Sequence, residues 1–185
     1  MTLDRILPFT KYLLEKSVAE GDIVIDATCG NGNDTVFLSQ LVGSGGKVVS
    51  FDIQPAAIQR AKVRLEETGR ENVLLILDGH ENVLEYVDDE ISAAVFNLGY
   101  LPGSDKTVTT NGATTWKAVV DILSLLKIGG IIVLVIYHGH EEGKVERHYI
   151  EVEIATLDPK ATSVLKYEFL NKASAPYVIA IEKIR

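Results

Sequence analysis

A glycine-rich turn, DATCGNGNDT at residues 26–35, is the segment with the clearest chemistry. It follows a short apolar run, and Gly30 and Gly32 allow the backbone to turn tightly and to approach a ligand closely. A dinucleotide site would need a third glycine three positions after Gly32, where this chain has Thr35. Asp26, which ends the apolar run, is also poorly placed for a pyrophosphate. The motif favours S-adenosylmethionine (AdoMet), whose amino group and sulfonium are cationic and which carries no phosphate.

Two further acids end apolar runs. Asp52 ends KVVSFD at residues 47–52, where a carboxylate can accept two hydrogen bonds from ribose hydroxyls. Asp78 ends VLLILD at residues 73–78, where an adenine amino group could donate to it. Each acid alone could be a simple turn or cap residue. Three such acids beside a glycine turn favour a cofactor site, because ligands of open α/β sheets bind at the carboxyl ends of the strands.

The segment FNLGYLPGSDK, residues 96–106, leaves a fourth apolar run at the same edge. The Asn97 side-chain oxygen and the Leu98 carbonyl could hold an amine and direct its lone pair at a methyl group. Tyr100 offers a flat face on which a base could stack. Methyl transfer from a sulfonium needs mainly proximity and orientation, which these groups could supply. The alternative is an ordinary strand-to-loop turn with a packed tyrosine.

Apolar runs that alternate with amphipathic ones predict the elements that position these groups. Five parallel strands are expected at 23–26, 47–52, 73–78, 93–97 and 130–137, and helices at 34–41, 55–68 and 114–126. Residues 143–157 are ambiguous, and chain order favours a helix. The runs 163–171 and 177–185 have no room for a helix between them and predict an antiparallel hairpin. We therefore expect an α/β fold in one domain, residues 1–185, with a mostly parallel seven-stranded sheet.

Composition narrows the class of protein. The chain has 185 residues, 46% apolar and 24% charged, with a net charge of −8, which is typical of a soluble globular protein. The negative charge weighs against a broad nucleic-acid-binding face and leaves room for a local basic patch. The single cysteine, Cys29, allows no internal disulfide and indicates a reducing compartment. We expect no signal peptide, no transmembrane helix and a cytoplasmic location.

Five motifs together resemble one family: DATCGNGNDT, FDIQ (51–54), DGHE (78–81), FNLGYLPGSDK and YHGHEEG (137–143). This is the putative rRNA methylase family, also called YtqB-like, whose characterised members are MnmM transfer-RNA methyltransferases. The resemblance spans nearly the whole chain and implies a class I AdoMet-dependent methyltransferase fold, which is Rossmann-like. It implies methylation of 5-aminomethyl-2-thiouridine at the tRNA wobble position, with the anticodon loop as the partner. Gly79 stands where Ser is common in the family, and His138 where Pro is common, which leaves the role of the His138 loop open.

The resemblance also implies roles for individual residues. The implied cofactor-binding residues are Asp26, Gly30, Asn31, Gly32, Asn33, Asp52, Ile53, Gln54, Asp78, Gly79, His80 and Asn97. Asn31 and Asn33 could meet the methionine moiety or could only stabilise the turn, and His80 could simply start a helix. Cys29 has no basic partner in its motif and is expected to be a small buried residue. No Cys/His spacing indicates a metal site.

An aliphatic amine is mostly protonated at neutral pH and must lose a proton before it attacks. A proton acceptor is therefore expected. The candidates are Asp105, His138 and His140, with Tyr137 less favoured; a histidine in such a loop could also be a solvated surface residue. The predicted catalytic set is Asn97, Tyr100, Asp105 and His138.

An RNA substrate has to be reconciled with the acidic charge. A single nucleotide in an exposed loop needs only a small footprint. Candidate phosphate contacts are Lys106, Lys117, Arg60, Lys62 and Arg64, of which the last three could instead form a solvated helix face. A homodimer could supply more surface. The alternatives are a class I methyltransferase acting on rRNA or a small-molecule amine, a dinucleotide-dependent oxidoreductase, and a catalytically silent AdoMet-binding domain.

Overall fold

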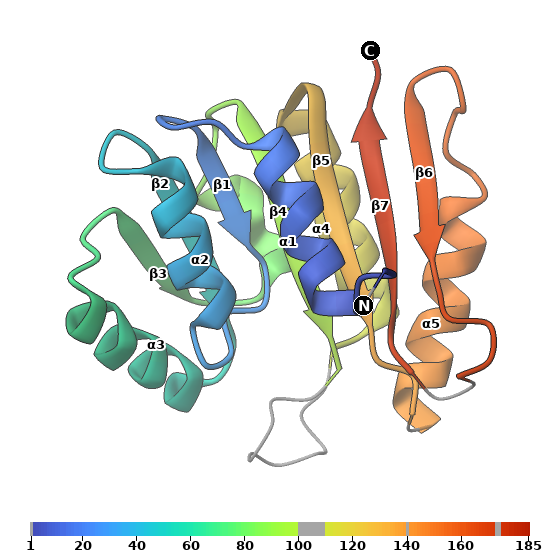
Figure 1. Cartoon of the computed structure of the whole chain (residues 1–185), viewed down its shortest axis with the longest axis horizontal. Coiled ribbons are helices and arrows are strands. Elements are labelled where there is room, and N and C mark those ends of the chain that lie inside the picture. Colours follow the sequence, from blue (N-terminus) through green and yellow to red (C-terminus); the bar gives the residue numbers. More distant parts are fainter. Residues whose placement is uncertain (1, 100–109, 140, 173–174) are drawn as a thin grey trace.

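The computed structural model describes residues 2–99, 110–139, 141–172 and 175–185 (Figure 1). Its strands are β1 (Ile23–Asp26), β2 (Lys47–Asp52), β3 (Val73–Leu77), β4 (Ile91–Leu98), β5 (Leu126–Ile136), β6 (Thr162–Tyr167) and β7 (Tyr177–Lys183). Its helices are α1 (Ile6–Ser17), α2 (Asn33–Val42), α3 (Pro55–Thr68), the 3₁₀ helix η1 (His80–Glu85), α4 (Gly112–Leu125) and α5 (Glu141–Ile154). The predicted elements are all present, and α5 settles the ambiguous segment as a helix.

The strands form one seven-stranded sheet in the order β3-β2-β1-β4-β5-β7-β6. The first five strands pair in parallel, and β7 pairs antiparallel with both β5 and β6. The predicted antiparallel hairpin is confirmed, and its second strand, β7, lies beside β5. Chain order reverses between β1 and β4, and this switch point is where open α/β sheets bind ligands.

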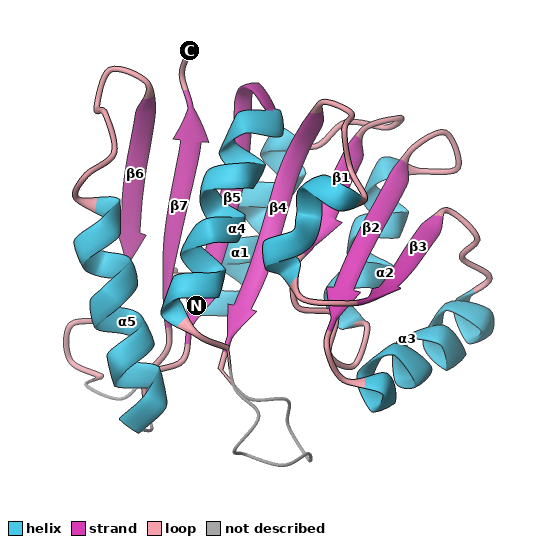
Figure 2. Ribbon diagram, turned by 180° about the vertical axis from the view of Figure 1, so that it is seen from behind, coloured by secondary structure: helices cyan, strands magenta, loops and turns pink. Residues whose placement is uncertain are grey.

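Alternate strand residues supply two cores, one on each face of the sheet. Val24, Val48 and Val133 face the side covered by α1 and α2, whereas Ile25 and Phe96 face the side covered by η1, α4 and α5. Figure 2 looks onto the face covered by α4 and α5. Because both faces are covered, the strands are almost wholly apolar, and polar side chains are left to gather at the strand ends.

Helix α1 is an element that the strand–helix pattern did not predict. Its buried residues Ile6, Thr10 and Leu14 recur every four positions and pack on the sheet near β4 and β5. Lys16 in the last turn complements the negative end of the helix dipole. The helix runs along the sheet, with its beginning near the carboxyl ends of the parallel strands (Figure 1). Within the described ranges, no helix has the length and apolarity needed to cross a membrane.

Candidate active site

A cavity of about 1360 Å³ opens at the carboxyl ends of β1, β2, β4 and β5. Single ligand pockets usually measure about 300–1,000 Å³, so this one has room for a cofactor and part of a second molecule. Ten of the predicted site residues line it: Gly30, Asn31, Asn33, Asp52, Ile53, Gln54, Gly79, His80, Asn97 and His138. Two predicted catalytic residues, Tyr100 and Asp105, lie outside the described residues, as does the candidate acceptor His140.

The Asp52 carboxylate ties the glycine turn to the end of β2. Its Oδ2 accepts a hydrogen bond from the Gly30 N–H at 2.9 Å, and its Oδ1 accepts one from the Gln54 N–H at 2.9 Å. Each carboxylate oxygen can accept a second hydrogen bond. The carboxylate is therefore held in place with acceptor capacity left for hydroxyl groups of a ligand in the cavity.

Gly32 acts in packing and does not line the cavity. It caps α2 with φ of +74°, in the left-handed region that favours glycine. A Cβ at this position would lie 3.0 Å from Ala61 Cα on α3. The predicted direct contact with the cofactor is thus corrected to a supporting role, because the glycine lets α2 approach α3.

Asp26 is also corrected, because its side chain is 0% exposed and does not line the cavity. Its Oδ2 accepts from Thr35 Oγ1 at 2.6 Å, and its Oδ1 accepts from the Thr28 N–H at 3.2 Å. Burial, reinforced by the neighbouring Asp34 carboxylate, raises the pKa of Asp26 to about 7. Asp26 therefore supports the turn from below and does not meet the ligand.

This raised pKa predicts a pH-dependent stability. Between the ordinary pKa of 3.8 and about 7, the folded chain holds the Asp26 proton more tightly than the unfolded chain does. The resulting stabilisation is present at low pH and is lost as the pH rises through about 7. Asp26→Asn cannot titrate, so its free energy of unfolding minus that of wild type should be roughly 2–3 kcal/mol larger at pH 8 than at pH 5, meaning that the variant is relatively more stable at pH 8. Urea unfolding at both pH values measures this, and an equal difference at both would contradict it.

Asp78 lies next to the cavity and does not line it. Its carboxylate accepts hydrogen bonds from the Tyr86 hydroxyl at 2.8 Å, the Gly79 N–H at 2.8 Å and Asn82 Nδ2 at 3.0 Å. These bonds, the one from Tyr86 first, lower the pKa of the carboxyl. The predicted contact with an adenine amino group stays a prediction, because Oδ2 accepts only the Tyr86 hydrogen bond and can accept a second one. The cavity wall here is Gly79, where a Cβ would overlap the Glu81 carboxylate.

Two buried histidines line the cavity, each with one ring nitrogen that has no partner among the described residues. His80 Nδ1 lies 2.9 Å from the Ala27 carbonyl oxygen, so Nδ1 carries the proton and Nε2 is an acceptor. Burial lowers the pKa of His80 and keeps it neutral. His138 Nε2 is likewise without a partner in the described part of the chain. Unpaired buried polar atoms are costly, so their presence at the cavity fits a polar ligand such as AdoMet.

Asn31 and Asn33 are oriented by arginines of α3. Arg60 Nη1 donates to Asn31 Oδ1 at 3.2 Å, and Arg64 Nη1 donates to Asn33 Oδ1. With both oxygens engaged, the NH₂ groups are the donors left for a ligand, which suits the anionic carboxylate of a methionine moiety. The same bonds engage two of the candidate phosphate contacts. A third, Lys117, pairs with Asp121 at 2.8 Å.

Asp34 is the lining residue of most chemical interest that the sequence did not single out. Asn97 Nδ2 donates to Asp34 Oδ2 at 2.6 Å, and the Asn97 N–H donates to Thr28 Oγ1 at 2.7 Å. Because the Nδ2 group is engaged, the Asn97 amide orientation is set, and its oxygen has no partner among the described residues. Burial raises the pKa of Asp34, and the Asn97 hydrogen bond opposes that rise. In the sequence, an acid in the first turn of a helix is explained by its interaction with the helix dipole. Only the contact with Asn97 in the folded structure indicates a role for Asp34 in the site.

The Leu98 carbonyl, Tyr137 and Cys29 are the predicted residues that remain to be placed. The Leu98 carbonyl accepts the Tyr137 N–H at 3.2 Å, which leaves one of its two lone pairs for a substrate amine. Tyr137 lines the cavity, and burial and the Asp34 charge raise its pKa. Cys29 is buried, as predicted, and burial raises the pKa of its thiol to about 12, so it is no nucleophile. Further lining residues come from α1 and the start of α4: Leu7, Pro8, Lys11, Tyr12, Glu15, Asn111 and Thr114.

Comparisons with known proteins agree with this geometry. A family model described as "Putative rRNA methylase" matches residues 48–182. The chloroplastic tRNA (mnm(5)s(2)U34)-methyltransferase of Arabidopsis thaliana is 36% identical over 180 residues, 91% of this chain and 66% of that protein. The crystal structure of a "putative rRNA-methylase" from Clostridium thermocellum is 41% identical, with 100% of both chains covered and a TM-score of 0.98. A "putative methyltransferase" from Streptococcus mutans, solved in complex with SAH, is 39% identical, with 98% of this chain and 99% of that chain covered and a TM-score of 0.91.

The sheet order, the cavity at the switch point and these likenesses define the class, that of class I AdoMet-dependent methyltransferases. Within this class, the chain belongs to the "Putative rRNA methylase" family, as its motifs indicated. The chain spans 66% of the length of the plant relative and 59% of the length of a demethylmenaquinone methyltransferase from Lactococcus lactis that is 27% identical.

Proposed function

We propose that the chain transfers a methyl group from AdoMet to the primary amine of 5-aminomethyl-2-thiouridine at the tRNA wobble position, giving 5-methylaminomethyl-2-thiouridine. The observation that carries this proposal is the Asn97 amide, which Asp34 holds at 2.6 Å at a cavity large enough for cofactor and nucleoside. The name of the plant relative, a tRNA (mnm(5)s(2)U34)-methyltransferase, supports the substrate.

AdoMet, when bound, supplies a methyl group already activated by a sulfonium. Asp52 would accept hydrogen bonds from the ribose hydroxyls, and the NH₂ groups of Asn31 and Asn33 would donate to the methionine carboxylate. Asn97 Oδ1 accepts an N–H of the substrate amine and directs its lone pair at the methyl carbon. The amine nitrogen then forms the new N–C bond as the C–S bond breaks and its electron pair stays on sulfur. The chain thus contributes chiefly position and orientation.

A primary ammonium must lose a proton before it attacks, because its pKa lies near 10. The Asp34 carboxylate favours the entry of a cation into the cavity. His138 is buried at the cavity, and its Nε2 has no partner among the described residues, so it is our proposed proton acceptor. A cation-attracting acid and a proton acceptor that line the same cavity suit an aliphatic amine better than the weakly basic exocyclic amine of adenine.

The proposal is tested by incubating the chain with labelled AdoMet and tRNA that bears 5-aminomethyl-2-thiouridine, followed by mass spectrometry of the nucleosides. A gain of one methyl on that nucleoside supports both reaction and substrate. No gain, with AdoMet still bound, would overturn the substrate. The family description then makes rRNA the second candidate, ahead of small amines.

A cytoplasmic location, a single domain over residues 1–185 and a homodimer stay predictions.

The role of Asp52 gives a separate prediction. Asp52→Ala should weaken AdoMet binding by about 10- to 100-fold, because it removes a charged hydrogen-bond acceptor and releases the Gly30 turn. Asp52→Asn keeps one side-chain acceptor and should show a smaller loss. Isothermal titration calorimetry with AdoMet measures both variants, and wild-type affinity in Asp52→Ala would refute the assignment.

A further inference from the structure

Helix α1 presents an exposed face at the mouth of the cavity. Leu7, Lys11 and Tyr12 all line the cavity. Leu7 and Tyr12 are each 47% exposed, so neither residue is buried in the hydrophobic core. Leu7, Lys11, Tyr12 and Lys16 are called the α1 face below.

The α1 face carries two cations, of which Lys11 is close enough to the Asp34 carboxylate to oppose the rise in its pKa. Lys16 Nζ lies 5.4 Å from the centre of the Tyr12 ring, and Lys11 Nζ lies 4.7 Å from the centre of the Phe37 ring. Neither lysine forms an ion pair with a described residue. Other lysines do form such pairs: Lys117, Lys127 and Lys166. In a chain of net charge −8, two ammonium groups on one helix, Lys16 beside the exposed Tyr12 ring and Lys11 beside Phe37, form a local site for an anion.

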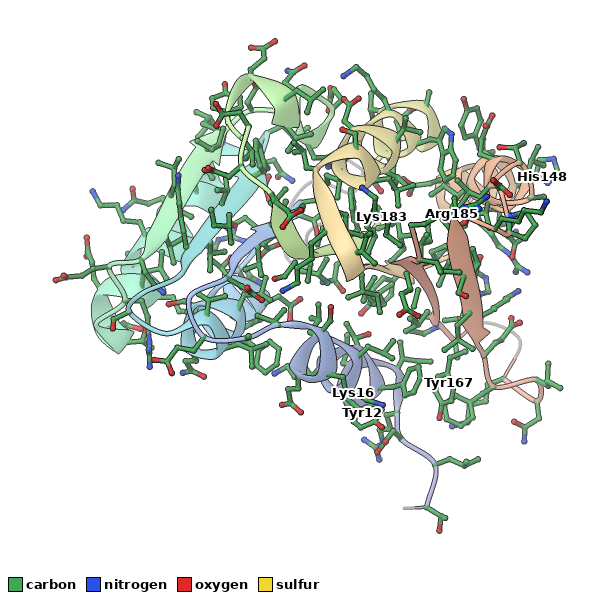
Figure 3. The ribbon with its side chains drawn as sticks, turned by 90° about the horizontal axis from the view of Figure 1, so that it is seen from above. Tyr12, Lys16, His148, Tyr167, Lys183 and Arg185 are labelled. Atoms are coloured by element: carbon green, nitrogen blue, oxygen red, sulfur yellow. The ribbon has the colours of Figure 1, made fainter. Side chains whose placement is uncertain are left out.

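The Tyr12 ring also has an aromatic neighbour. The Phe9 ring lies 6.2 Å from it and stacks on Tyr167 of β6 at 4.0 Å. The Tyr167 hydroxyl donates to the Asp4 carbonyl at 2.8 Å, which anchors this aromatic row. Figure 3 shows Tyr12 and Lys16 on α1, with Tyr167 nearby on β6. A ring held by its neighbours loses little further freedom when a base stacks on it.

We propose that the α1 face binds the RNA strand next to the reacting nucleotide, with a base stacked on Tyr12 and phosphates at Lys11 and Lys16. The proposal rests on the proposed function, since it takes RNA as the substrate. An aromatic platform flanked by cations is the usual means of holding single-stranded nucleic acid. Loop nucleotides of RNA are recognised in the same way, by stacking of unpaired bases. Glu15 also lines the cavity and disfavours phosphates in its immediate vicinity.

The test measures binding of an anticodon stem–loop RNA, with 5-aminomethyl-2-thiouridine at the wobble position, by fluorescence anisotropy across a salt series. Tyr12→Ala should weaken RNA binding about tenfold, whereas Tyr12→Phe, which keeps the ring, should bind like wild type. The double variant Lys11→Gln with Lys16→Gln should flatten the slope of log affinity against log salt by about 1.4, for two lost phosphate contacts on a single strand.

The matched control is Lys47→Gln with Lys160→Gln, two exposed lysines that precede or begin strands at the opposite edge of the sheet. It removes the same charge and should leave the salt slope unchanged. Calorimetry with AdoMet should give wild-type affinity for every variant, which shows that the cofactor site is intact.

Two outcomes would overturn the proposal for the α1 face alone. The first is wild-type RNA affinity in Tyr12→Ala and an equal salt slope in both lysine pairs. The second is a change of oligomeric state in Tyr12→Ala by analytical ultracentrifugation with RNA affinity unchanged, which would assign the face to a second copy of the chain. Failure of the proposed function appears separately, as a wild-type chain that does not methylate the wobble nucleoside.

Discussion

Asn97→Ala is expected to lower turnover by about 100-fold while AdoMet affinity stays at the wild-type value. The amide oxygen positions the amine and does not activate the methyl group, so its loss leaves the reacting atoms misaligned. In the proposed mechanism the cofactor is held mainly by the glycine turn and Asp52, whose mutual hydrogen bonds do not involve the Asn97 side chain. The turnover number from labelled methyl transfer, set beside calorimetric AdoMet affinity, measures the two effects separately.

A matched control is Asn82→Ala in η1. Asn82 donates its amide to Asp78, and neither residue lines the cavity. The Asn82→Ala variant removes an asparagine amide near the same edge of the sheet and should leave turnover unchanged. Equal losses of turnover and AdoMet affinity in Asn97→Ala would mean that Asn97 belongs to the cofactor site and not to the amine site.

Asp34→Ala is expected to have the second largest effect, a loss of turnover of about 10- to 100-fold. It removes the acceptor that holds the Asn97 amide at 2.6 Å, so the amide can rotate and present NH₂ in place of its oxygen. It also removes the negative charge that attracts the ammonium. Asp34→Asn keeps an oxygen that can accept from Asn97 and removes only the charge. It should therefore retain most of the turnover number and show a higher KM for the RNA substrate.

The pH profile distinguishes the charge of Asp34 from a merely structural role. Burial raises its pKa above the ordinary 3.8, so the carboxylate is fully charged only above that raised value. The KM advantage of wild type over Asp34→Asn should thus be complete above the raised pKa, at pH values where the substrate is still an ammonium (below about 10), and should shrink as the pH falls through the raised pKa. A ratio of KM values that does not change with pH would argue that Asp34 acts only by shape.

Local sequence patterns determined much of this fold. Apolar runs alternating with amphipathic ones can bury their side chains only as parallel strands covered on both faces, and five such strands are present. Gly30 and Asp52 were predictable as a pair, because a glycine turn after one strand and an acid after the next must meet at the same sheet edge. The resemblance of whole motifs to those of a known family identified the family, which composition alone would not have indicated.

Other features depended on contacts between elements far apart in the chain. Spacing could not show that Asp26 points beneath the glycine turn or that Asp78 turns toward Tyr86, because either carboxylate could have faced the cavity. Helix α1 has its own apolar stripe, but only packing on the sheet places Lys11 and Tyr12 at the cavity mouth. The sequence by itself determined which elements form and in which order. Tertiary structure alone decided which polar side chains face the cavity, because that choice depends on which partner residues from other elements compete for them.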